Sequence, residues 1–319
     1  MATEFSVLLF NVNNGRKENT SSRGITDDQF MGIQIVIEAA RKEPNLFVFC
    51  QDNITEEKDL ILKYKLGLSY FWYVIFRSLL KPIKRYLNYI LNREAGIYAD
   101  QRHRRVEWTH PDLTDLPHFE CSDRMTCRLY SLNGQSLLLV SWHGLTKLKT
   151  KNRTSNFNDR AELFVGLVKH IRQVQYASGA DIVVIGGDFN YSLMAASAAI
   201  RSNNELRHLS ARCIPSPSRT DESLKSSFDF ILTWPEGRLE VEQGYPKLLL
   251  FDFDRFDKIK EYPKSSIVDL SSMDRTCTDL QPFDHPRLLY RFKLKREGEE
   301  EQEQEQEEGE EGGEEGEEG

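Results

Sequence analysis

The feature that most constrains the fold of this 319-residue chain is a short apolar run that ends in polar residues, within the stretch DIVVIGGDFNYS. Residues 181–185 are rich in β-branched side chains and bounded by glycine, which is typical of a buried strand that ends at Gly186. Asp188 and Asn190 then emerge together at the carboxyl end of this strand. Open α/β sheets place ligand chemistry at this end of their strands. A glycine turn followed by a polar helix cap is the alternative for the stretch taken alone.

Earlier segments repeat the pattern of an apolar strand followed by polar residues. Residues 5–10 predict a strand that ends at Asn11, and residues 46–50 predict a second strand that ends in Gln51 and Asp52. Between these strands, a capping-box spacing and an apolar stripe of helical period predict a helix that begins near Thr26. The chain therefore alternates strands and helices from its start.

A hairpin and a capped helix follow in the middle of the chain. Asn133-Gly134, between two apolar runs, is the strongest short signal of a hairpin, and the second of these runs ends at His143. Asn158-Asp159 caps a helix whose apolar residues keep the 3.6-residue period. Residues 228–234 and 286–294 predict two later strands.

Polar residues that suit a metal-assisted reaction recur at the ends of these strands. They are Asn11, Asp52, His143, Asp188, Asn190, Asp229, Asp284 and His285. A single Asp or His at a strand end is typically a cap or a satisfied hydrogen-bond partner, but capping does not explain their joint recurrence. Carboxylate and amide oxygens suit a hydrated Mg²⁺ or Mn²⁺ that keeps water and substrate phosphate as its other ligands.

Charge is segregated along the chain. The formal net charge is -8, but residues 297–319 contain 14 glutamates and neither Lys nor Arg, which leaves 36 acidic against 42 basic residues and a net charge of about +6 for residues 1–296. The Glu-rich tail lacks apolar residues, so we expect it to be disordered. It either solubilises the protein or folds back on the basic body and competes with a polyanionic substrate.

Cysteine usage and the first residues favour an intracellular location, in cytoplasm or nucleus. The five cysteines make an odd count without CxxC spacing, which supports neither a disulfide framework nor a zinc site. The opening residues MATEFSVLLF contain no basic leader, so no signal peptide is visible. We therefore expect a reducing compartment.

Residues 64–93 are aromatic and basic and contain no acidic residue. Their apolar core, residues 66–76, is too short to span a bilayer, which takes about 20 residues, so no transmembrane anchor is expected. The segment suits a membrane surface or nucleic acid, and an ordinary strand and helix with solvated basic side chains is the alternative.

Six motifs in order resemble those of the endonuclease/exonuclease/phosphatase superfamily, which has the deoxyribonuclease I-like fold. They are FNVN, FVFCQDN, VSWHG, GGDFN, SFDFIL and FDHP, and the resemblance extends over about residues 4–295. GDFN followed about a hundred residues later by DHP is the specific part. The resemblance implies a two-sheet α/β sandwich over residues 1–296 with a metal cleft along one edge.

The resemblance also implies a role for each strand-end residue. His285, oriented by Asp229, is the general base or a phosphate-binding imidazole, while Asp188 and Asn190 position the attacking water or a phosphate oxygen. The metal is implied to lie at Asp52, with Asn11 and Asp284 beside it, and His143 is implied to donate to a phosphate oxygen. Asn11 and Asn190 are implied phosphate contacts as well. In-line attack on a phosphodiester needs such donors, a cation and a tuned base.

These residues together predict metal-dependent hydrolysis of phosphodiester bonds. The basic body and the stretch QRHRR, residues 101–105, favour nucleic acid as the substrate. Two alternatives stay open: a phosphatase acting on inositol or lipid phosphates, and a catalytically weak relative that binds phosphate or nucleic acid. The second is motivated by Asp52, which stands where the family has glutamate and is shorter by one methylene.

Overall fold

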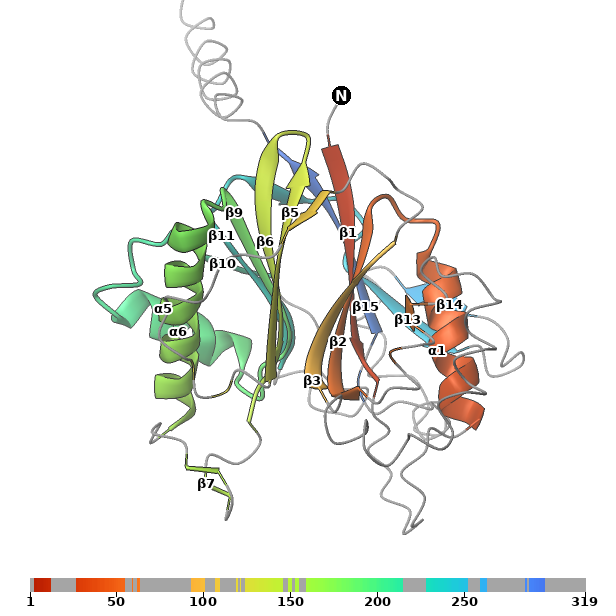
Figure 1. Ribbon diagram of the computed structural model, residues 1–319, viewed down its shortest axis with the longest axis horizontal. Helices are drawn as coiled ribbons and strands as arrows, with labels where there is room; N and C mark the ends of the chain where they lie inside the picture. Colours follow the sequence, from red (N-terminus) through yellow and green to blue (C-terminus); the bar gives the residue numbers. More distant parts are fainter. Residues whose placement is uncertain are drawn as a thin grey trace, which may run out of the picture.

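Two mixed β-sheets packed face to face form the centre of the protein in the computed structural model (Figure 1). Sheet 1 has the strand order β14-β13-β15-β1-β2-β3, with β12 paired to β15, and sheet 2 has the order β10-β11-β9-β6-β5-β4. The helices α5 and α6 cover the outer face of sheet 2, and α1 covers the outer face of sheet 1 (Figure 1). This arrangement confirms the predicted two-sheet α/β sandwich.

The structure describes residues 3–12, 27–54, 59, 62–63, 93–100, 107–109, 119, 121, 124–145, 149–150, 153–154, 159–214, 228–251, 259–262, 285 and 287–295. The predictions for residues 64–92, for QRHRR, for Asp284 and for the acidic tail lie outside these ranges. Among the described helices, none has both the length and the hydropathy that crossing a membrane takes.

The described elements have the following bounds. Sheet 1 contains β1 (Thr3–Asn11), β2 (Leu46–Ile54), β3 (Arg93–Ala99), β12 (Leu239–Val241), β13 (Lys247–Phe251), β14 (Ile259–Tyr262) and β15 (Arg287–Leu294). Sheet 2 contains β4 (Glu107–Thr109), β5 (Met125–Leu132), β6 (Gln135–His143), β9 (Ile182–Asp188), β10 (Arg212–Ile214) and β11 (Asp229–Trp234). The helices are α1 (Asp27–Ala40), α5 (Arg160–Ser178) and α6 (Leu193–Ser202), and β7 (Lys149–Thr150) pairs with β8 (Arg153–Thr154).

The alternation of side chains along β15 shows how the layers are built. Leu288, Tyr290 and Phe292 belong to the apolar core between the two sheets. Leu289 belongs instead to the core between sheet 1 and α1. Because successive side chains of a strand point to opposite faces, an unbroken apolar run suits a strand that is covered on both sides.

Local sequence signals predicted the β5–β6 hairpin and the helix α5 correctly. Asn133 (φ 52°) and Gly134 (φ 82°) join β5 to β6 with positive φ at both turn positions, as a type I′ turn requires. Asp159 caps α5, and its side chain accepts a hydrogen bond from the Glu162 N–H. The predicted end of β9 at Gly186 was wrong by two residues, because pairing to both β6 and β11 continues as far as Asp188.

The two glycines of β9 allow sheet 1 and the neighbouring strand β6 to approach β9 closely near its carboxyl end. A Cβ at Gly186 would lie 2.7 Å from Leu9 Cδ2 and 2.9 Å from Phe49 Cδ2, both in sheet 1. A Cβ at Gly187, where φ is 147°, would lie 1.9 Å from the carbonyl oxygen of Trp142 on β6. The close packing fixes the position from which Asp188 emerges.

Candidate active site

Three adjacent strands of sheet 2 place acidic and imidazole side chains in a row. His143 on β6 is paired with Asp188 on β9, and Asp188 is paired with Asp229 on β11. All three side chains are buried, with exposed fractions of 6%, 3% and 3%. Strand register therefore brings together residues that are far apart in the sequence.

His285 joins this row from the other sheet. It precedes β15 of sheet 1, and its Nδ1 lies 3.1 Å from Asp229 Oδ2 and 3.3 Å from Asp229 Oδ1. Its other ring nitrogen, Nε2, lies 3.8 Å from Asp188 Oδ2. The predicted pair of Asp229 and His285 is thus present as a hydrogen-bonded unit.

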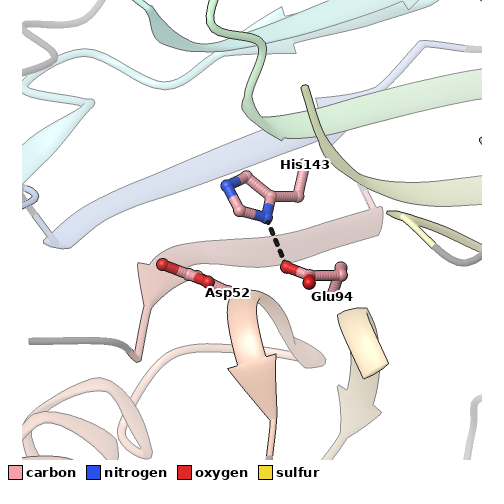
Figure 2. A group of neighbouring side chains, drawn as sticks. All are labelled: Asp52, Glu94 and His143. Atoms are coloured by element: carbon pink, nitrogen blue, oxygen red, sulfur yellow. Dashed lines mark hydrogen bonds and ion pairs between the residues drawn. The ribbon is translucent and has the colours of Figure 1, made fainter. Parts of the chain in front are cut away.

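His143 has a carboxylate partner that the sequence did not reveal. Its Nδ1 lies 3.1 Å from Oε2 of Glu94, a residue of β3 in sheet 1 (Figure 2). Its Nε2 lies 4.0 Å from Asp188 Oδ2. Glu94 adjoins the aromatic, basic segment, and its place depends on the pairing of β3 with β2, in which Ala95 lies opposite Gln51.

The side chains form an alternating series of acids and imidazoles across the two sheets. In order, they are Glu94, His143, Asp188, His285 and Asp229. Each imidazole has its Nδ1 at a carboxylate, which fixes the orientation of the ring and favours Nδ1 as the protonated nitrogen. The two Nε2 atoms then converge on Asp188 Oδ2 at 4.0 Å and 3.8 Å. These separations exceed a hydrogen bond and suit an intervening water or phosphate oxygen.

Asn190 is held in a strained turn directly after β9. Its φ of 48° lies in the left-handed region, which asparagine tolerates better than most residues. Its backbone N–H donates to Asp188 Oδ1 (2.8 Å), and its Nδ2 donates to the Gly144 carbonyl (3.0 Å) and to Asp188 Oδ2 (3.2 Å). Arg160 Nη1 donates to the Asn190 carbonyl at 2.7 Å. These contacts leave the amide oxygen of Asn190 as the atom that can face a substrate.

Asp52 lies near Glu94 and His143 (Figure 2). Asp52, Glu94 and His143 each offer a ligand atom, and these atoms lie within 4.8 Å of one another. The Asp52 backbone has φ 63°, at an irregularity in the pairing of β2 with β3. The buried Asn11 is paired with Gln51, next to Asp52 in the chain, while Asp284 lies outside the described residues.

Within the part of the chain that the structure describes, two groups of side chains have the donor chemistry for a divalent cation. The second group consists of Asp188, Asp229 and His285. Its two carboxylates are buried, with 3% exposed each, whereas Asp52 and Glu94 are partly exposed, so that water can complete the ligand shell of a cation there. Asp52 and Glu94 supply two carboxylates at the edge of the site, and one or two carboxylates completed by water are what Mg²⁺ or Mn²⁺ prefers. The first group therefore fits the metal better.

Polar contacts across the sheets support the site from below and beside it. Gln51 Nε2 donates to Ser141 Oγ (3.1 Å), and Ser141 Oγ donates to the Cys50 carbonyl (3.1 Å). Arg124 was not anticipated from the sequence: its Nη1 donates to the Gly144 carbonyl (3.0 Å) and lies 3.3 Å from His143 Nδ1. The contacts of Ser141 with Gln51 and Cys50 join the two sheets where the site is formed.

Burial changes the acidity of one member of the row. It raises the pKa of the Asp229 carboxyl from 3.8 to about 6, and the neighbouring His285 opposes this shift. The Asp188 carboxylate contributes in the same direction as burial. Asp229 therefore changes its charge close to neutral pH, as groups in active sites often do.

The two stacked sheets and the acidic, imidazole-rich end between them define the class of this molecule: it has the endonuclease/exonuclease/phosphatase fold, as the motifs predicted. The structure of the endonuclease/exonuclease/phosphatase from Bacteroides vulgatus has a TM-score of 0.50 and 13% identity, and the match covers 92% of this chain and 100% of that one. At this identity the likeness establishes the fold alone.

Two further solved structures are similar at lower scores. The human Nocturnin catalytic domain with bound sulfate has a TM-score of 0.47 and 12% identity, over 92% of this chain and 94% of that one. Truncated TDP2 from Caenorhabditis elegans has a TM-score of 0.46 and 14% identity, over 91% and 98%. No protein-family model matches the sequence, and a search of curated proteins finds no match.

Proposed function

We propose that this protein hydrolyses phosphodiester bonds in nucleic acid with the help of Mg²⁺ or Mn²⁺. The observation that carries the proposal is the convergence of two carboxylate-held imidazoles on Asp188, with Nε2 atoms at 4.0 Å and 3.8 Å from one oxygen. A phosphodiester needs both a base for the attacking water and donors for its non-bridging oxygens. Two imidazoles of fixed orientation supply both.

The roles divide between the two imidazoles. His285, held by Asp229, accepts the proton of the attacking water at Nε2, while Asp188 orients that water. As the new P–O bond forms, the bond to the leaving oxygen breaks. His143, held by Glu94 and carrying a proton on both ring nitrogens, donates from Nε2–H to a non-bridging phosphate oxygen. A carboxylate at Nδ1 stabilises the charged form of each ring, as in catalytic triads on unrelated folds.

Asn190 acts through its amide oxygen. The family resemblance implies either the attacking water or a phosphate oxygen as its partner. Because Nδ2 donates to the Gly144 carbonyl and to Asp188, it is not the group that meets phosphate; the amide oxygen instead accepts a hydrogen bond from the attacking water. Asn190 and Asp188 then fix the direction of attack.

Asp52 and Glu94 would hold the metal, with Asn11 and Asp284 as the further positions that the family resemblance suggests. When bound, the cation stabilises negative charge on the phosphate oxygens. We also propose that residues 1–296 form the catalytic domain, since both sheets and all candidate site residues fall within them, and that the Glu-rich residues 297–319 are not part of it.

The test compares cleavage of labelled single- and double-stranded DNA and RNA in Mg²⁺, in Mn²⁺ and in chelator. We expect cleavage that depends on metal and is lost in His285→Ala. The exposed His208 provides a matched control, and His208→Ala should retain full activity. Release of inorganic phosphate from inositol or lipid phosphates, without strand cleavage, would instead identify a phosphatase.

Asp52 favours a second candidate, a protein that binds nucleic acid without cutting it. Its carboxylate is shorter than glutamate, so the metal would be held more loosely. This candidate predicts salt-dependent binding that survives chelation. Asp52→Glu distinguishes the two candidates. If the protein is an enzyme whose metal is held loosely by Asp52, the variant should be more active; if it only binds nucleic acid, the variant should bind without cleaving.

A further inference from the structure

We propose that the Glu-rich tail, residues 297–319, docks on a basic patch of the protein's own surface, away from the candidate active site. The basic patch consists of Arg201, Arg207 and Arg212, with His208 beside them, and all four side chains are exposed. Among the arginines whose side chains the structure describes, four are exposed, and three of these belong to the patch. Positive charge is therefore concentrated here on the described surface.

The connection from α6 to β10 gathers these side chains. Arg201 lies in the last turn of α6, and Arg212 is the first residue of β10, which α6 contacts. Between them, the Arg207 N–H donates to the Asn203 carbonyl at 2.9 Å, which turns the connection back on itself. Arg207 Nε in turn donates to His208 Nε2 at 3.2 Å, so these two side chains lie together. The positive groups therefore share one short stretch of surface.

The described carboxylates near the patch do not neutralise it. Glu205 lies within the same connection, but its Oε1 is 2.8 Å from Lys169 Nζ of α5, so this acid is already paired. Within the described ranges, no ion pair includes any of the three patch arginines. Glu236, exposed at the adjoining turn, offsets one of their three charges and leaves the patch with a net charge of about +2.

Local structure accounts for single charges of the patch and not for their grouping. A positive charge at Arg201 is favourable in the last turn of a helix. A charge at Arg212, on the edge strand of sheet 2, discourages pairing with another chain. Neither reason applies to Arg207 and His208, which lie outside helix and strand. A ligand of opposite charge accounts for the whole group.

The tail begins next to this patch. The Lys295 N–H donates to the Arg238 carbonyl at 3.0 Å, and the Glu236 N–H donates to the Ser210 carbonyl at 2.6 Å. The turn after β11 therefore joins the end of β15 to the segment just before Arg212. Two hydrogen-bonded contacts and two residues separate Lys295 from Ser210, a path of roughly 17 Å, which about five extended residues span. The remaining tail is free to lie along the patch.

Strand register places the patch at the end of sheet 2 remote from the acids and imidazoles. Arg212 is paired with Thr233, and Asp229 lies four residues earlier on the same strand. Four residues of a strand extend for about 13 Å. A tail docked on the patch therefore covers the far end of the sheet and leaves the candidate active site open.

Tethering allows weak ion pairs to fill the patch. An exposed ion pair strengthens binding by at most about fivefold, so a separate Glu-rich peptide would bind weakly. The tail is attached a few residues away, which gives it an effective concentration on the order of mM. Its 14 glutamates also offer many registers to three arginines. At about 1 M salt, where the Debye length is about 3 Å, the tail should leave the patch.

The first experiment locates the tail by carbodiimide cross-linking, which joins a carboxylate to an amine. The full-length variant Arg207→Lys offers the tail a new amine within the patch. Arg160→Lys is the matched control, because Arg160 is the fourth exposed arginine and lies at the start of α5, beside Asn190. We expect mass spectrometry to find several-fold more tail adduct in Arg207→Lys, at a yield that is independent of protein concentration and lost in 1 M salt. Equal yields in the two variants would overturn the proposal.

The second experiment measures the affinity of the patch directly. All 14 tail glutamates are replaced by glutamine in the full-length protein, and a labelled peptide of residues 297–319 is titrated in low salt. We expect anisotropy to show binding that weakens about fivefold in Arg207→Gln and is lost when Arg201, Arg207 and Arg212 are all changed to glutamine. Arg160→Gln should bind the peptide as the parent does. Binding that persists in the triple variant would contradict the proposal.

A labelled oligonucleotide tests nucleic acid as the other occupant of the patch. If the tail occupies it, the oligonucleotide should bind more tightly to the tail-neutral protein than to the wild type in low salt, and the triple variant should remove this gain. Equal affinity for these two proteins, together with weaker binding to the triple variant, would show that nucleic acid occupies the patch and would overturn the proposal. None of these measurements requires cleavage, so their outcome is independent of the proposed function.

Discussion

At the scale of single residues, the buried carboxyl of Asp229 links stability and activity to pH. The folded protein raises its pKa from 3.8 to about 6, so between these values the unfolded chain binds fewer protons than the folded one. The contribution of Asp229 to the free energy of unfolding therefore falls as the pH rises through this window. A buried carboxylate that is kept at some cost in stability suggests a role in function.

We predict opposite effects of Asp229→Asn on stability and activity. The free energy of unfolding of the variant, relative to wild type, should rise from pH 4 to pH 7, because the variant lacks the buried charge. Activity should fall by about 10²- to 10⁴-fold, because an amide cannot stabilise the charged His285 ring. Urea unfolding and cleavage assays across this pH range measure both. A variant with wild-type activity would show that His285 works without Asp229.

The Glu94 carboxylate provides a second prediction. Glu94→Gln keeps an acceptor for His143 Nδ1 but removes the negative charge beside Asp52. We expect the affinity for Mn²⁺, measured by calorimetry, to fall about 10- to 100-fold. Glu240→Gln, a change at an exposed residue of β12, is the control and should bind Mn²⁺ as the wild type does. Equal affinities in all three proteins would place the metal elsewhere.

Individual residues of the site were predictable where a strong local motif marks the end of a strand. Asp188 and Asn190 follow the GG of β9, and Asp229 and His285 lie where the motifs indicated. Glu94 and Arg124 were not predicted, because both stand at the amino end of a strand and neither lies in a recognisable motif. Their roles arise from contacts with His143 that depend on the approach of β3 and β5 to β6.

At the scale of elements, the end of β9 depends on glycine. We expect Gly187→Ala to destabilise the protein by about 3 kcal/mol or more, because its Cβ would lie 1.9 Å from the Trp142 carbonyl and neither strand can move without breaking the β6–β9 ladder.

Gly134→Ala is the matched control for this change. Gly134 also has positive φ, but no atom lies within 4 Å of the position of its Cβ. Gly134→Ala should lower the free energy of unfolding by only about 1 kcal/mol, which is the penalty for the positive φ alone. Urea denaturation of the two variants compares them directly. Equal losses of stability in the two variants would mean that the positive φ of Gly187, and not its close contact with Trp142, accounts for the cost.

Elements with strong local signals were predicted well, and elements defined by pairing were not. The β5–β6 hairpin follows from Asn133-Gly134, and α5 follows from its cap and apolar period. By contrast, β3 begins at the end of the aromatic, basic segment, for which the sequence left open a surface-binding segment or an ordinary strand and helix. Its place at the edge of sheet 1 is set by its pairing with β2, which no local pattern contains.

At the scale of the whole molecule, the site exists only where the two sheets meet. Asp52, Glu94 and His285 come from sheet 1, while His143, Asp188 and Asp229 come from sheet 2. The hydrogen-bonded pairs of His143 with Glu94 and of His285 with Asp229 both cross the interface between the sheets. A cation bound between residues of this junction must therefore stabilise the folded sandwich as a unit.

This coupling predicts that metal raises the melting temperature. A ligand that binds only the folded state at 100 times its Kd adds about 2.7 kcal/mol, which corresponds to roughly 5 °C for a domain of this size. Mn²⁺ should therefore shift the thermal transition upward by a few degrees and chelator should reverse the shift. Asp52→Ala should lose the shift while Glu240→Ala retains it, because only Asp52 lies at the junction. A shift that persists in Asp52→Ala would place the stabilising cation away from the two sheets' shared edge.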